Sequence, residues 1–159
     1  MSEDDLPDGV RRMLAAANDR GLSVELRVRP AARSLPEAAA ILGIEPSDIA
    51  KTLVVRLPDG EHLFVVVGGD ATFSWPKLRG LLGVNKLSMP DADGALAATG
   101  YERGTITPIG SEPGWPVYVD ERLRGRRVAM GAGGHGYSAF VEVDDLITAF
   151  GAEVADLVK

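Results

Sequence analysis

Two different spacings of apolar residues run through the first 43 positions of the chain. Over residues 7–20, apolar side chains recur three and four positions apart, a spacing that predicts an amphipathic helix. Over residues 22–29 they alternate with polar side chains, which predicts a strand with one buried face. A second helix is predicted over residues 35–42, because Ser34 and Glu37 have the spacing of a capping box at its start.

The middle of the chain predicts a hairpin followed by short elements. Residues 52–57 and 61–67 form apolar runs around a tight turn, and both runs are apolar on both faces, so the hairpin is expected to lie centrally. Residues 87–89 are expected to form a short strand and residues 91–99 a short helix. Between them Ser74 is expected to cap another helix, whose inward face would be formed by Trp75, Leu78, Leu81 and Leu82.

The segment from residue 101 to residue 115 interrupts this regular pattern. Its glycines and prolines leave no room for a helix or strand, yet Ile106 and Ile109 are apolar, which predicts an ordered loop. A long ordered loop inside a compact domain is usually functional. After it, the pattern predicts strands at 117–119, 127–130 and 139–143, a helix capped by Asp144 and running to residue 150, and a strand or helical tail at 152–158.

Together these elements predict a mixed α/β fold with a mixed, curved sheet flanked by helices. Several strands follow one another through turns, which argues against a doubly wound sheet. A length of 159 residues suits one domain, and no repeat, low-complexity tract or linker divides the chain. We therefore expect residues 1–159 to form a single domain, with the helix and strand of residues 1–33 as part of it.

Composition and charge narrow the class of protein. Hydrophobic residues make up 45% of the chain and charged residues 25%, as in ordinary soluble globular proteins. No apolar run approaches the ~18 residues of a membrane span, and the acidic residues 2–5 do not resemble a signal peptide, so a cytoplasmic location is expected. The net charge of −6 argues against general nucleic-acid coating and against DNA binding, while local contact with an RNA end remains open.

Residue types also limit the cofactors that the chain could use. It has no cysteine, and its two histidines are 73 positions apart with no HExxH pattern, so neither a metal nor another cofactor is expected. Residues 131–136 match GxGxxG after a predicted strand, but another strand follows where a dinucleotide site needs a helix. The remaining interpretation is a glycine turn that lets a ligand approach the backbone closely.

Three further features have two interpretations each. Lys51 stands where a helical segment gives way to an apolar strand, so it lies along the strand edge with its ammonium in water or it meets a ligand in a cleft. His135, in the glycine turn, is a substrate-binding or acid–base group or a bystander without an evident partner. A solvated turn or a phosphate-contact surface would account for the basic cluster of Arg122, Arg124, Arg126 and Arg127.

The order of lysine strand, GxxxP loop and glycine turn resembles the freestanding aminoacyl-tRNA deacylases of the YbaK type, which are related to the editing domain of prolyl-tRNA synthetases. The resemblance extends from about residue 34 to residue 157. It implies a mixed sheet that is partly closed into a barrel and flanked by helices. The segments that carry it are residues 38–43, 49–53, 67–70, 78–83, 100–110 and 116–120, with the glycine turn before Asp144.

The resemblance also implies an activity and a set of site residues. The activity is hydrolysis of the ester that joins a wrong amino acid to the 3′-terminal ribose of tRNA, with the tRNA acceptor end and an aminoacyl-tRNA synthetase as partners and without membrane or DNA. Lys51 matches the family's signature lysine beside the terminal nucleotide, and Gly104 and Pro108 match the loop that holds the aminoacyl group and the attacking water. The remaining implied pocket positions are Thr52, Ile106, Gly110, Gly131, Gly133, His135 and Ser138.

The chain departs from the family pattern at several of these positions. Gly131 and Ser138 stand where relatives carry larger or more acidic residues, and residues 134–135 stand where many have two longer polar side chains, so the amino acid that is removed stays open. The expected mechanism is metal-free, with positive charge from Lys51, water positioned by the backbone of residues 104–108, and help from the substrate's 2′-hydroxyl. The alternative is a non-catalytic binding module for a free amino acid or a partner protein.

Overall fold

The computed structural model describes residues 5–159, so most of the acidic segment at residues 2–5 lies outside the described residues. Two 3-10 turns, η2 (Pro46–Asp48) and η3 (Glu121–Leu123), accompany the helices and strands. In chain order, the elements of the described part are α1 (Asp8–Asp19), β1 (Glu25–Val28), α2 (Leu35–Leu42), β2 (Ala50–Arg56), β3 (His62–Gly68), α3 (Trp75–Leu82), α4 (Ala92–Thr99), β4 (Val117–Asp120), β5 (Arg127–Gly131), β6 (Tyr137–Glu142), α5 (Val143–Phe150) and β7 (Glu153–Ala155).

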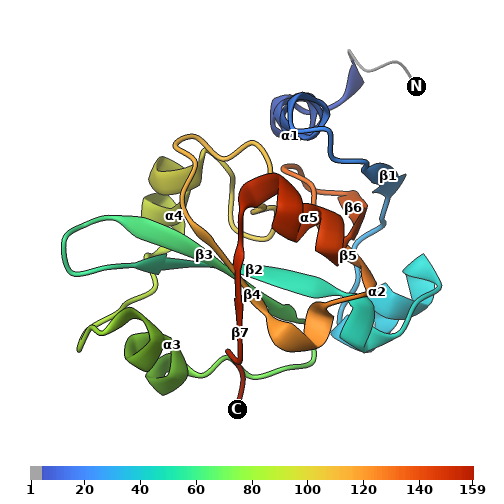
Figure 1. The fold of residues 1–159 in the computed structure, drawn as a ribbon. Coiled ribbons are helices and arrows are strands. Elements are labelled where there is room, and N and C mark those ends of the chain that lie inside the picture. Colours follow the sequence, from blue (N-terminus) through green and yellow to red (C-terminus); the bar gives the residue numbers. More distant parts are fainter. Residues whose placement is uncertain (1–4) are drawn as a thin grey trace.

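The strands form two sheets. β2, β3, β4 and β7 make a mixed sheet, in which β2 and β3 are an antiparallel hairpin while β4 runs parallel to β3 and β7 parallel to β4. β1, β6 and β5 make a smaller antiparallel sheet. An isolated parallel bridge between Ile49 and Ala129 joins the two. Figure 1 shows α3 and α5 on opposite sides of the mixed sheet.

The predicted mixed α/β class and mixed sheet are confirmed, but the partly closed barrel is not confirmed. A barrel needs a continuous ladder of paired strands around its circumference. Between the two sheets of residues 5–159 that ladder is reduced to the Ile49–Ala129 bridge, and both sheets stay open. The prediction that residues 1–159 form one domain stays a prediction. Among the described residues, no helix is long and apolar enough to cross a membrane.

β3 is the most deeply buried strand, as the central position of the hairpin predicts. Its residues from Leu63 to Val67 are at most 2% exposed, because both faces of the mixed sheet are covered. Phe64 and Val66 face the larger core, which the antiparallel sheet, α1 and α5 complete. Val65 and Val67 face a second cluster that is completed by α3 and the C-terminal residues.

The caps predicted from the sequence form, with one change of partner. Ser34 Oγ accepts a hydrogen bond from the Glu37 amide at 3.2 Å, and Ser74 Oγ accepts one from the Lys77 amide at 3.4 Å. Glu37 Oε2 accepts from the Arg33 amide at 3.3 Å rather than from the amide of the cap residue. Local side-chain chemistry therefore determines where α2 and α3 begin.

Some element predictions were wrong, each for a tertiary reason. Val28 is 63% exposed, because β1 is an edge strand that is shorter than predicted. Leu81 was expected to face inward but is 44% exposed, because α3 contacts the sheet on one side only. The cap residue of α5 is Glu142, while the carboxylate of Asp144 accepts from the Gly125 amide at 3.0 Å. The strand predicted at residues 87–89 is reduced to a bridge between Arg56 and Ser88.

Candidate active site

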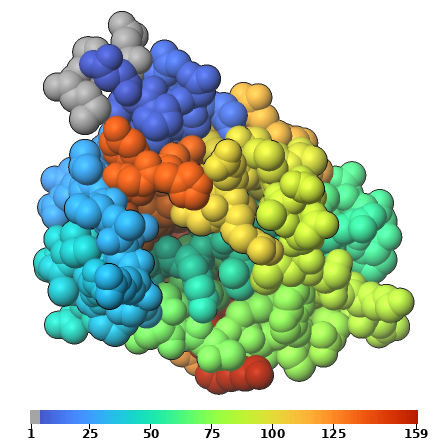
Figure 2. Space-filling view, turned by 180° about the vertical axis from the view of Figure 1, so that it is seen from behind, coloured from blue at the N-terminus to red at the C-terminus, as the bar shows by residue number. Residues whose placement is uncertain are grey.

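A cavity of about 450 Å³ opens where the two sheets meet. Its walls include β2, α2 with the segment before it, the end of β5, the start of β6, and the loop that follows α4. Figure 2 shows the hollow, with residues near 35 on one side and residues near 105 on the other. Segments far apart in the sequence therefore build one concave site.

Six of the ten residues predicted for the site line this cavity. The other four, Pro108, Gly110, Gly133 and His135, do not line it. Pro108 and Gly110 border a separate hollow beside α1. The residues that the cavity brings together are Lys51, Thr52, Gly104, Ile106, Gly131 and Ser138.

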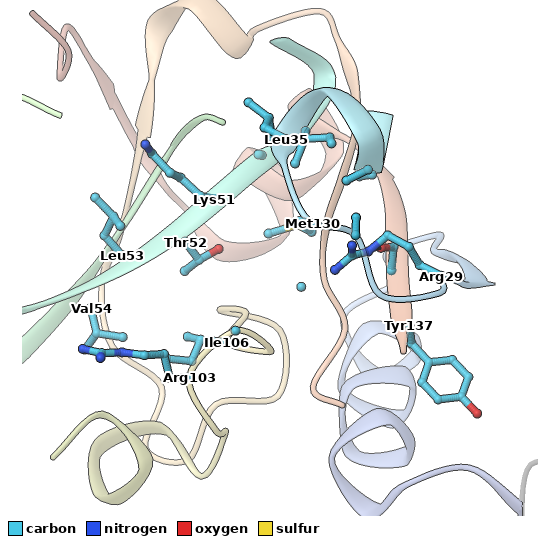
Figure 3. A pocket seen from close by; sticks show the side chains of 18 of the residues that line it. Arg29, Leu35, Lys51, Thr52, Leu53, Val54, Arg103, Ile106, Met130 and Tyr137 are labelled. Atoms are coloured by element: carbon cyan, nitrogen blue, oxygen red, sulfur yellow. Dashed lines mark hydrogen bonds between the residues drawn. The ribbon is translucent and has the colours of Figure 1, made fainter. Parts of the chain in front are cut away.

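Lys51 and Thr52 leave opposite faces of β2, as neighbours on a strand must (Figure 3). Lys51 Nζ points away from the centre of the cavity and donates a hydrogen bond to the Ala71 carbonyl at 2.8 Å. Thr52 Oγ1 is buried and has no hydrogen-bond partner within the described residues. A buried hydroxyl without a partner is costly, so it is a candidate ligand contact.

The GxxxP loop is held in shape by its own side chains. Thr105 Oγ1 donates to the Glu102 carbonyl at 2.7 Å, and the Tyr101 hydroxyl donates to the Ile109 carbonyl at 2.7 Å. Thr107 Oγ1 accepts from the Ile109 amide at 3.2 Å. Burial raises the pKa of Tyr101, so its hydroxyl stays a neutral donor. The prediction of an ordered loop is confirmed, and it presents Gly104 and Ile106 to the cavity.

The glycine turn packs directly against this loop. The Gly133 amide donates to the Thr105 carbonyl at 2.9 Å, and a Cβ on Gly131 would lie 2.4 Å from the Ile106 carbonyl oxygen. Gly133 has a φ of +87°, and a Cβ there would lie 2.5 Å from the carbonyl oxygen of Gly9. The glycines allow close backbone approach, as predicted, but the segments that approach are the GxxxP loop and α1.

His135 has a partner that the sequence did not reveal. Its Nε2 lies 3.1 Å from Glu102 Oε2, and both side chains are 68% exposed. An exposed contact of this kind contributes little stability. The pair lies at the surface beside Gly104, whose Cβ position would be 3.8 Å from the imidazole, rather than in the cavity wall.

Two arginines of the cavity wall were not predicted. Arg29 and Arg103 line the cavity together with Lys51, while no aspartate, glutamate, histidine or cysteine among residues 5–159 lines it. Arg103 could have been found from its position directly before Gly104, whereas Arg29 looked like one polar residue of an alternating strand. Nor do three or more metal-ligating side chains gather anywhere in residues 5–159.

The basic cluster after β4 lies away from the cavity, and each of its arginines is paired with carboxylates. Arg124 Nε is 3.9 Å from Asp144, and Arg126 Nη1 is 3.4 Å from Asp48. Neither these nor the other two arginines line the cavity, and partnered, exposed arginines of this kind favour a solvated turn. The remaining pairs join Arg122 to Asp120 and Asp156, and Arg127 to Glu25 and Glu142.

Comparison with known proteins identifies the family of the chain. Residues 29–149 match the family model described as the aminoacyl-tRNA editing domain. The chain is 37% identical over 115 residues to a proline–tRNA ligase of Shouchella clausii and 30% identical over 120 residues to one of Pelobacter propionicus. These matches cover 72% and 76% of this chain but only 20% and 21% of the ligases, so the chain spans about a fifth of the length of these relatives.

A solved structure gives a match over nearly the full length. It is described as a candidate trans-editing enzyme for prolyl-tRNA synthetase, and it superposes with a TM-score of 0.89 at 28% identity. The superposition covers 98% of this chain and 99% of that one. The resemblance inferred from the lysine strand, GxxxP loop and glycine turn is confirmed at the level of the family. Because the family model spans most of the chain, the protein belongs to the aminoacyl-tRNA editing domain family.

Proposed function

We propose that this protein is an aminoacyl-tRNA deacylase, which hydrolyses the ester of mischarged tRNA. The observation that carries the proposal is a cavity between β2 and the GxxxP loop that is lined by cations and by no carboxylate of the described residues. Family membership supports it, as does the full-length likeness to a candidate trans-editing enzyme. The proposed partner is the acceptor end of tRNA, with an aminoacyl-tRNA synthetase as the source of the substrate.

The proposed chemistry needs a positioned water and stabilisation of an oxyanion. An aminoacyl ester is already activated, so one well-placed donor is worth on the order of 10²–10³ in rate. Backbone groups at Gly104 and Ile106 would orient the water, because their loop is held rigid by internal hydrogen bonds. Residues 5–159 contribute no carboxylate or imidazole to the cavity wall that could act as base, so the substrate's own 2′-hydroxyl would assist proton transfer. This chemistry uses no metal.

Lys51 would supply positive charge at the margin of the cavity. Its hydrogen-bond partner, the Ala71 carbonyl, is neutral, so the charge of the ammonium is not cancelled by an ion pair there. The same bond ties β2 to the segment after β3. Lys51 therefore supports the shape of the site as well as its charge.

The test is a panel of mischarged tRNAs, including cysteinyl, alanyl and seryl forms, incubated with the protein and with a Lys51→Ala variant. We expect the wild-type protein to hydrolyse at least one of them, and Lys51→Ala to lower its kcat/KM by about 10²-fold without unfolding. The exposed Lys86→Ala is the charge-matched control and should retain activity. Thermal unfolding of each variant separates lost chemistry from lost structure.

A panel in which no ester is hydrolysed above background would contradict the proposal. It would favour the second candidate, a binding module that holds a free amino acid or a partner protein without turnover. The engagement of the Lys51 ammonium by Ala71 is the observation that favours this alternative, because it turns the charge away from the cavity centre. Binding of free amino acids, measured by calorimetry, would then identify the ligand.

A further inference from the structure

The charge of the cavity is opposite to the charge of the protein. The chain has 17 basic and 23 acidic residues, a net charge of −6. Yet, in the part of the chain that the structure describes, the cavity is lined by three cationic side chains, Arg29, Lys51 and Arg103, and by no acidic one. A concave site with one sign of charge concentrates ligands of the other sign. A ligand that enters here is therefore expected to bring an anionic group to these cations.

Among these cations, Arg29 is the one that is both pre-oriented and available. Its backbone amide donates to the Gly136 carbonyl at 2.7 Å, and its Nε donates to Ser138 Oγ at 3.2 Å. Ser138 is only 6% exposed, so the anchor itself is fixed. Within the described residues the two Nη groups of Arg29 make no hydrogen bond, and the side chain extends toward the middle of the cavity (Figure 3).

The other two cations are less suited to hold an anion in one place. Lys51 donates to the Ala71 carbonyl and lies on the far face of β2. Arg103 is exposed and has no partner in the part of the chain that the structure describes, so its position is less constrained. A guanidinium that is held through Nε still has its two Nη groups as donors for bidentate contact with a phosphate. Because the side chain is already oriented, binding costs little further side-chain entropy.

We infer that Arg29 binds the phosphate on the 5′ side of the terminal nucleotide, with Ser138 as its positioning residue. The inference rests on the proposed function. In an aminoacyl-tRNA end the amino acid's own carboxylate is consumed in the ester and its α-amino group is positive. The anionic group that every such substrate shares is the backbone phosphate. Arg29 is thus the anchor of the nucleotide, and the repulsion it exerts keeps the α-ammonium away from that side of the cavity.

Binding of two simple probes tests this inference without any catalysis. Adenosine and adenosine 5′-monophosphate differ in the phosphate alone, and calorimetry gives the dissociation constant of each. We expect the monophosphate to bind about tenfold or more tightly than adenosine, as a charge-assisted contact requires. Arg29→Gln should remove this preference, and Ser138→Ala should reduce it, because the guanidinium is then no longer held. Arg124→Gln, which removes the same charge outside the cavity, should leave the preference unchanged.

The second readout is the kinetics of ester hydrolysis, measured with a mischarged tRNA from the panel that the wild-type protein deacylates. Arg29→Gln should raise KM and leave kcat within about twofold, since a phosphate contact is equal in ground and transition states. The slope of log KM against log salt concentration should fall by about 0.7, the value for one phosphate contact to a single strand. Arg29→Lys should restore part of the affinity, because it keeps the charge and loses the fork.

Equal affinity for the two probes, failure of both to bind, or an unchanged preference in Arg29→Gln would overturn the inference. If Arg29 recognised an acidic amino-acid side chain instead, the variant would lose aspartyl and glutamyl esters selectively while the monophosphate preference persisted. Hydrolysis of mischarged tRNA without any Arg29 dependence would refute the inference and leave the deacylase proposal standing. Arg29-dependent binding of the monophosphate without hydrolysis of any mischarged tRNA would support the inference about Arg29 and contradict the deacylase proposal.

Discussion

Thr52 has a polar atom whose partner is missing from the protein itself. Its Oγ1 is buried in the wall of the cavity and makes no hydrogen bond within residues 5–159. An unpaired buried hydroxyl costs about 1–3 kcal/mol. A protein keeps such a cost when a ligand supplies the missing partner, which is how we interpret Thr52.

Replacing Thr52 with valine therefore has opposite effects on stability and function. Thr52→Val should leave the free energy of unfolding unchanged or raise it, because an unsatisfied hydroxyl is replaced by a methyl group of similar shape. It should lower kcat/KM by about three- to tenfold through the lost hydrogen bond. Urea unfolding and deacylation kinetics measure the two effects.

Thr99→Val is the matched control for this substitution. Thr99 is also buried, but its Oγ1 donates to the Ala95 carbonyl at 2.8 Å and accepts from the Tyr101 amide at 3.1 Å. Its loss should destabilise the protein by about 1–3 kcal/mol. Equal destabilisation by both valine variants would show that Thr52 has a partner in the folded protein.

Among the elements, the contact between the GxxxP loop and the end of β5 decides the geometry of the site. Gly131 lies against two carbonyl groups of the loop, and its Cβ position would be 2.4 Å from Ile106 O and 3.0 Å from Thr105 O. Both atoms belong to the backbone, so neither can rotate away. The absence of a side chain at Gly131 is what allows Gly104 and Ile106 to reach the cavity.

Gly131→Ala should accordingly displace the loop and lower kcat/KM by at least tenfold, because small misplacements at a reacting centre are costly in rate. We also expect a loss of stability of about 1–3 kcal/mol from overpacking. Gly80→Ala is the control, because nothing lies within 4 Å of its Cβ position in α3, and it should stabilise the protein by about 0.5–1 kcal/mol. Wild-type kinetics in Gly131→Ala would contradict this account.

For the molecule as a whole, an ion-pair network fastens the C-terminal segment to the mixed sheet. Asp156 accepts from Lys77 Nζ at 2.6 Å and from Arg122 Nη1 at 2.8 Å, which joins α3 to η3. Beside it, the Leu157 amide donates to Asp120 Oδ1 at 3.0 Å. The hydrogen bonds from Lys77 and then Arg122 lower the pKa of Asp156 to about 2.

This lowered pKa predicts a contribution to stability that depends on pH. A carboxyl whose pKa is lower in the folded than in the unfolded state stabilises the fold above the unfolded value, near 4, and loses that effect as pH falls toward 2. The free energy of unfolding should therefore fall less between pH 6 and pH 3 in Asp156→Asn than in the wild type. The exposed Asp19→Asn should behave like the wild type. Urea unfolding of the wild type and both variants at pH 6 and pH 3 measures these free energies.

The helices and the central hairpin were predictable because their signals are local. Ser34 and Ser74 accept the cap hydrogen bonds expected of them, and the apolar runs on both sides of residues 58–60 pair as β2 and β3. Exposure was harder to predict. Val28 and Leu81 have the spacing of inward residues, but nothing in the spacing shows that β1 is an edge strand or that α3 is covered on one side only.

The candidate site was predictable in part. The family resemblance selected six residues that line the cavity, among them Thr52 and Gly104. Arg29 was not predicted, because its orientation depends on Ser138, which lies 109 positions away along the chain. The partner of His135 was not predicted for the same reason, since Glu102 is 33 positions distant in the sequence.

The sequence by itself determined the order of elements, their caps, the ordered loop and the family to which the chain belongs, since each depends on residue types at short and regular spacings. The tertiary structure decided that the strands form two open sheets and that Lys51 and Thr52 face different surroundings. It also decided that Arg29 and Arg103 share a cavity to which residues 5–159 contribute no carboxylate. These properties arise from contacts between segments distant in the sequence, and such contacts form only when the chain has folded.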